Sequence, residues 1–224
     1  YQITKGSFVD GEGFADVTVT GSQTDVGESA NKITGHTLKD NTLAENYTIT
    51  YVDGELIVWA KTLTITADSA SKPYDGTPLT KNTYASTELA NGDTIESVTV
   101  TGSQTDVGSS DNVASAAVIK NASGKNVTGN YKITYKSGTL EVTASGDIQN
   151  NIALTTADVE HMYDGNTYNA GTATAIDSKG GAVKIEYSVD GATWTTKPGT
   201  IKATNVADSV TVQVRVTSAN YEGS

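Results

Sequence analysis

Three aromatic side chains are the residues best suited to bind a ligand. An exposed aromatic ring offers a flat apolar face and a polar edge, which suits stacking against a sugar. Trp194, Tyr168 and Tyr84 are the candidates for such a platform. Trp194 lies in a stretch of alternating apolar residues, where a core position is the more ordinary interpretation. Binding of a glycan or of another protein is therefore one hypothesis for this chain.

Acidic side chains occur in pairs, an arrangement that a glycosidase would need. The pairs Asp10 with Glu12 and Asp25 with Glu28 lie in loops, where a solvated acidic surface is the ordinary explanation. A glycosidase also needs a cleft between its two carboxylates and burial that raises the pKa of one of them. Small, weakly apolar units leave little room for such a cleft. We therefore expect no catalytic residue and no enzyme activity.

Residue types that bind metals or cofactors are scarce. The chain has no cysteine and two histidines, His36 and His161, which lie far apart in the sequence. A zinc site draws several His or Cys ligands, so both imidazoles are expected at the surface. No phosphate-binding glycine motif is present, and no loop has the dense acidic spacing of a Ca²⁺ site. The sequence predicts neither a metal nor a cofactor.

The overall composition excludes two classes of partner. A net charge of −11 over 224 residues disfavours nucleic acid, because its binding requires Lys and Arg. No apolar run approaches the roughly 20 residues of a membrane span, so no membrane insertion is expected. With 36% hydrophobic residues the chain can form modest cores, and we expect a monomer.

An internal repeat is the most informative feature of the sequence. Residues 17–27 recur without change as residues 98–108, an offset of 81. Residues 46–51 match residues 130–135, an offset of 84. The three extra residues fall most simply in the polar loop around residues 121–129, where an insertion leaves strand registers untouched.

A third, divergent copy follows the first two. The motif Tyr-Asp-Gly at residues 74–76 returns at residues 163–165, and Asn220-Tyr221 echoes the Asn-Tyr pairs of the other copies. The first copy lacks an opening strand and a Tyr-Asp-Gly segment, and the third stops before its last strand. The predicted domains are residues 1–60 (N-terminally truncated), 61–144 (complete) and 145–224 (divergent and C-terminally truncated). These are called the first, second and third repeat below.

The local pattern predicts strands throughout. Val and Thr alternate with period two in stretches such as residues 63–66 and 98–101, and Asp-Gly turns punctuate them. Residues 51–56 and 187–194 are predicted hairpins with tight turns at Asp-Gly. Strands spaced by 8–12 residues in an all-β unit indicate a small sandwich. Tyrosine and tryptophan are expected to fill the cores: Tyr74, Tyr131 and Tyr135 in the second repeat, and Tyr163, Tyr187 and Trp194 in the third.

The motifs of the second repeat resemble a known family. Lys72-Pro73-Tyr74-Asp75-Gly76-Thr77, residues 98–108, residues 130–135 and residues 138–142 are similar to the MBG/YDG-type repeats of large bacterial surface proteins. The resemblance implies tandem extracellular modules in adhesins, at the bacterial cell surface or cell wall, with no catalytic residues. The third repeat looks like a divergent Ig-like relative. The expected fold is a series of Ig-like β-sandwich modules in an elongated array, with β-grasp-like modules as the alternative.

Duplication of a whole unit favours a structural role. A ligand-binding site works as a single copy, whereas a stalk becomes longer only when its unit is repeated. A stalk or spacer is therefore the leading hypothesis. The joints are short, since Trp59-Ala60-Lys61 connects the first two repeats and residues 144–147 connect the last two. The expected partners are neighbouring repeats of the same chain. A module that binds a host glycan or host protein is the alternative.

Overall fold

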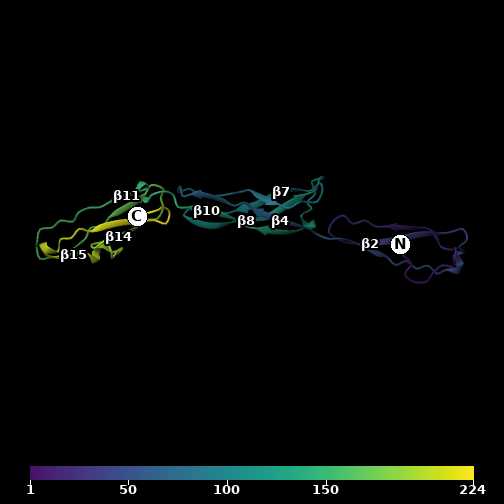
Figure 1. The fold of residues 1–224 in the computed structure, drawn as a ribbon. Helices are drawn as coiled ribbons and strands as arrows, with labels where there is room; N and C mark the ends of the chain where they lie inside the picture. The colour runs from purple at the N-terminus through teal and green to yellow at the C-terminus, as the bar shows by residue number, and fades with distance from the viewer. The chain divides into compact units, whose positions relative to one another are not determined.

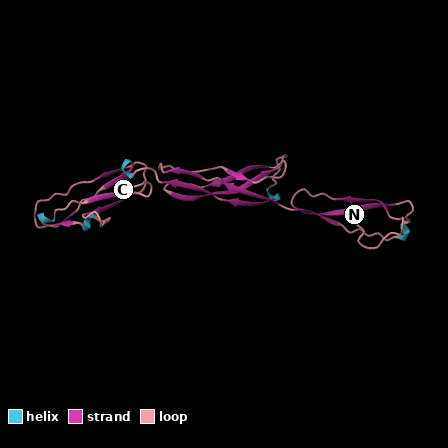
Figure 2. Ribbon diagram, viewed as in Figure 1, coloured by secondary structure: helices cyan, strands magenta, loops and turns pink.

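The computed structural model describes all residues from 1 to 224, and β-strands dominate it (Figure 2). Sixteen strands and five short 3-10 helices make up the ordered elements. The prediction of an all-β protein is therefore confirmed. No α-helix is present for a β-grasp sheet to enclose, and the small sheets are consistent with β-sandwich modules. The structure has no helix long and apolar enough to cross a bilayer.

The first repeat forms one antiparallel sheet. Strand β2 lies in the middle and pairs with β1 on one side and β3 on the other. A single 3-10 turn, η1 (Ala44–Asn46), follows β2. The bounds are β1 (Phe14–Thr20), β2 (Gly27–Leu38) and β3 (Gly54–Val58).

The second repeat contains two sheets, with strand orders β5-β10-β8-β7 and β6-β4-β9. Figure 1 labels β4, β7, β8 and β10 in this part of the chain. Strand β5 pairs with β10 in parallel, and β8 pairs with β10 antiparallel. The elements are β4 (Lys61–Ala67), β5 (Ala70–Pro73), β6 (Tyr84–Ser86), β7 (Thr94–Thr101), β8 (Gly108–Lys120), η2 (Thr128–Asn130), β9 (Tyr131–Lys136) and β10 (Gly138–Thr143).

The third repeat is built from three two-stranded sheets, β11-β13, β12-β15 and β14-β16. Each pair is antiparallel. The elements are η3 (Ile148–Asn150), β11 (Ile152–Thr155), β12 (Tyr168–Asn169), β13 (Thr174–Asp177), β14 (Lys184–Ser188), η4 (Pro198–Thr200), β15 (Lys202–Ala203), η5 (Val206–Asp208) and β16 (Gln213–Thr217).

One predicted hairpin is right and the other is wrong. Tyr187 and Thr195 exchange both backbone hydrogen bonds, at 2.8 and 3.0 Å, which confirms the hairpin at residues 187–194. In the first repeat β3 pairs with β2 and not with the residues before Asp53. The same holds in the second repeat, where β9 and β10 belong to different sheets. In the second repeat the Ser137-Gly138 turn therefore carries the chain from one sheet to the other.

Contacts divide the chain into two compact units, and the division passes through the second repeat. Strands β4, β7, β8 and β9 each run from one unit into the other. The bounds of the three predicted domains stay predictions. Unit 1 holds Tyr1–Thr64, Ser86–Val98 and Ala116–Thr134, and unit 2 holds Ile65–Ala85, Thr99–Ser115 and Tyr135–Ser224.

Tyrosines supply part of the core, as expected from the sequence. Tyr74, Tyr131 and Tyr187 are buried, which confirms three of the predicted core positions. Tyr135 and Tyr163 are exposed, so those two predictions are wrong. Burial decreases along β9, so that its last tyrosine lies beyond the core, and Tyr163 lies in a loop with no strand to hold it.

Candidate functional site

Trp194 is half-buried and one face of its ring is covered. The guanidinium carbon of Arg215 lies 4.2 Å from the centre of the indole ring, a cation–π contact. The indole nitrogen donates a hydrogen bond of 3.2 Å to the carbonyl of Gly191. These contacts hold the ring against its own hairpin, and a role in ligand binding stays a prediction.

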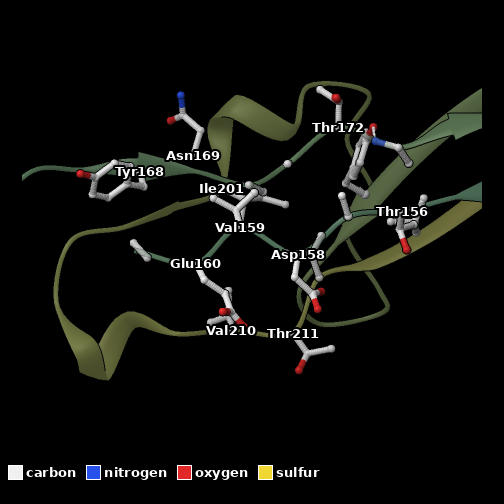
Figure 3. A pocket seen from close by; sticks show the side chains of 18 of the residues that line it. Thr156, Asp158, Val159, Glu160, Tyr168, Asn169, Thr172, Ile201, Val210 and Thr211 are labelled. Atoms are coloured by element: carbon white, nitrogen blue, oxygen red, sulfur yellow. Dashed lines mark hydrogen bonds between the residues drawn. The ribbon is translucent and has the colours of Figure 1, made fainter. Parts of the chain in front are cut away.

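Tyr168 lines a cavity of about 580 Å³ in the third repeat (Figure 3). Its ring stacks on His161 with the centres 3.6 Å apart, and its hydroxyl donates a 2.7 Å hydrogen bond to Asp164. That bond, together with hydrogen bonds from Asn166, lowers the pKa of the Asp164 carboxyl to about 2, and it raises the pKa of the Tyr168 hydroxyl. Glu160 and Val159 line the same cavity.

Tyr84 lies in the three-residue strand β6 and is half-buried. Neither Tyr84 nor Trp194 lines the cavity at Tyr168. The structure therefore does not bring the three predicted platform residues to one site. Their role in binding is untested by the geometry.

Glu12 and His36 make local contacts within the first repeat. Glu12 accepts a hydrogen bond from the hydroxyl of Tyr47, and the ring of His36 contacts the hydroxyl of Tyr51. No group of three or more His, Asp or Glu side chains is placed to hold a metal ion. Asp25, predicted to be part of a solvated surface, has a side chain that is 49% exposed and also takes part in a joint between repeats.

Two asparagines of the Asn-Tyr pairs, whose partners the sequence analysis did not name, connect the repeats. Asn130 of the second repeat reaches the loop at residues 25–26 of the first. Its side-chain nitrogen donates to Asp25 at 2.9 Å, and its side-chain oxygen accepts from the backbone N–H of Val26 at 2.8 Å. Lys125 adds an ion pair of 2.7 Å to the same carboxylate. Hydrogen bonds from Asn130 and Lys125 lower the pKa of Asp25.

The same arrangement recurs between the second and third repeats. Asn220 donates from its side-chain nitrogen to Asp106 at 3.0 Å, and its oxygen accepts from the backbone N–H of Val107 at 2.9 Å. Asp106-Val107 is the repeat equivalent of Asp25-Val26. We call this contact, in which Asn binds the Asp-Val of the preceding repeat, the asparagine clasp.

The second clasp is reinforced by an aromatic cluster. Tyr74 of the second repeat packs edge-on against Tyr221 of the third, with ring centres 5.5 Å apart. Both side chains are buried together with Val142, Ile148 and Val216. Tyr221 also donates a 2.7 Å hydrogen bond to Asp177. Burial first, and then this carboxylate, raises the pKa of Tyr221.

The chain between the second and third repeats is hydrogen-bonded rather than free. Ser145 donates from its backbone N–H to the carbonyl of Asn220 at 3.1 Å, and Glu222 donates to Gly146 at 2.9 Å. Ile148 returns a bond of 2.9 Å to Glu222. The linker residues 144–147 are therefore tied to the last residues of the third repeat.

Tyr-Asp-Gly is part of this joint. A Cβ added at Gly76 would lie 2.7 Å from the carbonyl oxygen of Lys179 in the third repeat. The ammonium group of Lys179 lies 5.5 Å from the centre of the Tyr221 ring. Glycine thus allows the loop after Tyr74 to approach the neighbouring repeat.

Comparison with known proteins finds one family that is similar to the second repeat. Residues 63–141 match the family model of the MBG domain (YGX type), which spans almost all of that repeat. No curated protein and no solved structure is detectably similar to the chain. The matched segment contains most of β4, all of β5 to β9 and most of β10. Residues 63–141, within the second repeat, are thus similar to the MBG domain of the YGX type.

Proposed function

We propose that this chain is a non-catalytic spacer region of a bacterial surface protein, in which stiffly joined repeats form an extracellular stalk that serves adhesion. The MBG family itself suggests a repeat module of surface proteins. The observation that carries the finer proposal is the asparagine clasp, found with the same donor and acceptor atoms at both repeat boundaries.

A spacer must resist bending at its joints. A free linker of several residues behaves as a flexible coil, whereas β3 ends at Val58 and β4 begins at Lys61. The clasp adds two directional hydrogen bonds beside this short connection. Since a hydrogen-bond pair holds its partners only in a narrow range of angles, it favours one orientation of each joint.

The third repeat has a segment related to the Asp-Val acceptor of the clasp, with Asn205 in place of the Asp and its side chain bonded to Asp208. Residues 204–207 (Thr-Asn-Val-Ala) occupy the place of Thr-Asp-Val-Gly, and Val206 is 79% exposed. Tyr163, the counterpart of the buried Tyr74, is 68% exposed. These residues would bind a further repeat as their counterparts bind the third. The exposed loops therefore support a series of repeats.

Small-angle scattering of the intact chain tests the spacer. A compact globule of 224 residues has a radius of gyration of about 17 Å. One repeat containing a strand of 13 residues is about 40 Å long, so three repeats in line would give roughly 30 Å or more. The Asn130→Ala, Asn220→Ala double variant should give a broader distribution of distances than the wild type. A wild-type radius near that of the globule would refute the spacer.

A second function, glycan binding, has one observation in its favour. Tyr168 lines a cavity whose volume of about 580 Å³ lies within the range of small-molecule sites. We expect Tyr168→Ala to abolish binding on a glycan array while Tyr84→Ala and Trp194→Ala leave it intact. An array with no hit for the wild-type chain would dispose of this function.

A further inference from the structure

The first repeat shares strand motifs with the second but does not share its buried core. Leu140 and Val142 are 0% and 1% exposed, whereas their counterparts Leu56 and Val58 are only half-buried. No apolar side chain before Leu63 is buried anywhere in the chain. Because the residue types match at these two positions, we infer that their difference in burial comes from segments that cover the second repeat and not the first.

Strand β4 and the segment after it provide that cover in the second repeat. Strand β4 lies between β6 and β9 and contributes Leu63, Ile65 and Ala67, all nearly inaccessible to solvent. Strand β5 pairs with the outer side of β10. The counterpart of β10 in the first repeat, β3, has a neighbour on one side only.

The first repeat keeps the two flanks of the missing strand. The counterpart of β6 is residues 3–5, and the counterpart of β9 is residues 47–52. Neither is a strand, and Ile3 and Val52 are exposed. An extended segment with no paired neighbour presents free N–H and C=O groups, to which an added strand can bind.

A groove of about 960 Å³ lies between these flanks. Residues from both flanks line it, among them Ile3, Ile49 and Tyr51, and the sheet contributes Val17 and Ile33. The groove is therefore apolar along the sheet and has unpaired backbone along its sides. In the second repeat β4 packs its apolar side chains into the core and pairs its backbone with the two flanking strands β6 and β9.

An unpartnered amide in the groove points to the same occupant. In the second repeat the buried side chain of Asn112 donates to the carbonyls of Asp68 and Lys81, at 2.8 and 2.7 Å. Both acceptors lie in the segment that follows β4. The counterpart of Asn112 is Asn31, which lines the groove and makes no side-chain hydrogen bond.

We propose that the groove of the first repeat is a binding site for an opening strand of the β4 type. Its occupant is the extended segment of a like repeat, with the apolar-Thr alternation and the following loop seen in residues 61–81. Apolar side chains at the positions of Leu63 and Ile65 would fill the groove, and a carbonyl of the following loop would accept from Asn31. The site does not depend on the spacer role, since it would also serve a chain that bends freely.

The repeat offset provides a direct test. Tyr1 corresponds to Asn82, so a copy of residues 61–81 fused directly ahead of Tyr1 restores the register of the second repeat without a linker. Hydrogen exchange of the backbone amides of Ile49 and Tyr51 is measured in the intact and the fused chain. We expect both amides to exchange at least about tenfold more slowly after fusion, because they acquire strand partners.

Matched controls distinguish a specific strand from added length. The same fusion with Leu63→Asp and Ile65→Asp in the copied segment only should leave the exchange unchanged, and Asn31→Ala should weaken the protection. A synthetic peptide of residues 61–81 added to the intact chain should protect the same amides in a saturable manner. Protection by the aspartate fusion, or none in either the fused chain or the peptide titration, would overturn the proposal.

Discussion

Replacement of Asn220 by alanine measures what the asparagine clasp contributes to a joint. Asn220 is buried, and its side-chain oxygen is the acceptor for the N–H of Val107, which is itself half-buried. The substitution leaves this N–H without a protein partner. A buried amide that loses its acceptor costs roughly 1–3 kcal/mol, and partial access of water to Val107 places the expected cost at about 2 kcal/mol.

Backbone hydrogen exchange is the assay with the necessary resolution. Since 1.4 kcal/mol corresponds to a factor of ten, about 2 kcal/mol predicts that the Val107 amide exchanges roughly 30-fold faster in Asn220→Ala. The Val26 amide, which is bound by Asn130 at the other joint, serves as the internal reference. It should keep its wild-type rate in this variant.

The chain supplies a matched control for this experiment. Asn46 is the counterpart of Asn130 and Asn220 in the first repeat, is exposed, and makes no side-chain hydrogen bond. Asn46→Ala should therefore change neither amide. If Asn220→Ala leaves Val107 protected, or if Asn46→Ala loosens the joints equally, the clasp does not hold the repeats as reasoned here.

Three further substitutions have expected outcomes. Ala116 adopts φ 51°, a left-handed conformation that costs an L-residue roughly 1 kcal/mol, so Ala116→Gly should stabilise the chain against urea; a lower midpoint would contradict this. Burial and Asp177 raise the pKa of Tyr221 above 10.0, so the stabilisation by the neutral phenol is present below pH 10.0 and is lost as the pH rises through the pKa of the folded state. Alkaline unfolding should therefore show that Tyr221→Phe loses less free energy of unfolding above pH 10.0 than the wild type does. A Cβ at Gly138 would lie 2.5 Å from the carbonyl oxygen of Ala67, whereas one at its counterpart Gly54 would meet nothing closer than 3.7 Å. Thermal melts should therefore show that Gly138→Ala destabilises the chain by roughly 1–3 kcal/mol and that Gly54→Ala does not. Equal effects would be evidence that the first repeat does not lack the strand that crowds Gly138 in the second.

Much of the second repeat could be predicted from the sequence. The alternation of Leu63 and Ile65 with threonine places apolar side chains on one face of a strand, and both are buried in β4. Period-two patterns are local, and the strand conformation they indicate is local as well. The all-β class and the tyrosines at positions 74 and 131 followed from the same reasoning.

Sheet membership could not be predicted in this way. An Asp-Gly or Ser-Gly turn between two strands looks like a hairpin from the sequence, yet β9 and β10 join different sheets. The close approach of Gly138 to the backbone at Ala67 accompanies this crossing. Which partner a strand selects depends on contacts far away in the chain, and a turn signal carries no information about them.

The clasp was missed although its signal was present. Asn-Tyr occurs in all three repeats, at Asn46, Asn130 and Asn220, and the sequence analysis used it only to align them. Within a single repeat, the asparagine beside the core tyrosine has no structural role. The groups that it binds lie about 100 residues away in the chain. The repeat pattern could therefore identify the asparagine but could not predict which residues it binds.

The Asn-Tyr pair takes part both in the fold of its own repeat and in the contact with the neighbouring repeat. Tyr131 closes its own repeat, because its hydroxyl accepts from the N–H of Ala90 and donates to Asp93. Tyr47 makes the equivalent contacts with Val9 and Glu12. Asn130 ends the 3-10 turn η2 and Tyr131 begins β9, so the side chain that contacts the neighbouring repeat directly precedes the one that closes its own repeat. A repeat that loses its tyrosine contacts would therefore also misplace its clasp, and the stability of each repeat and the stiffness of its joint should decline together.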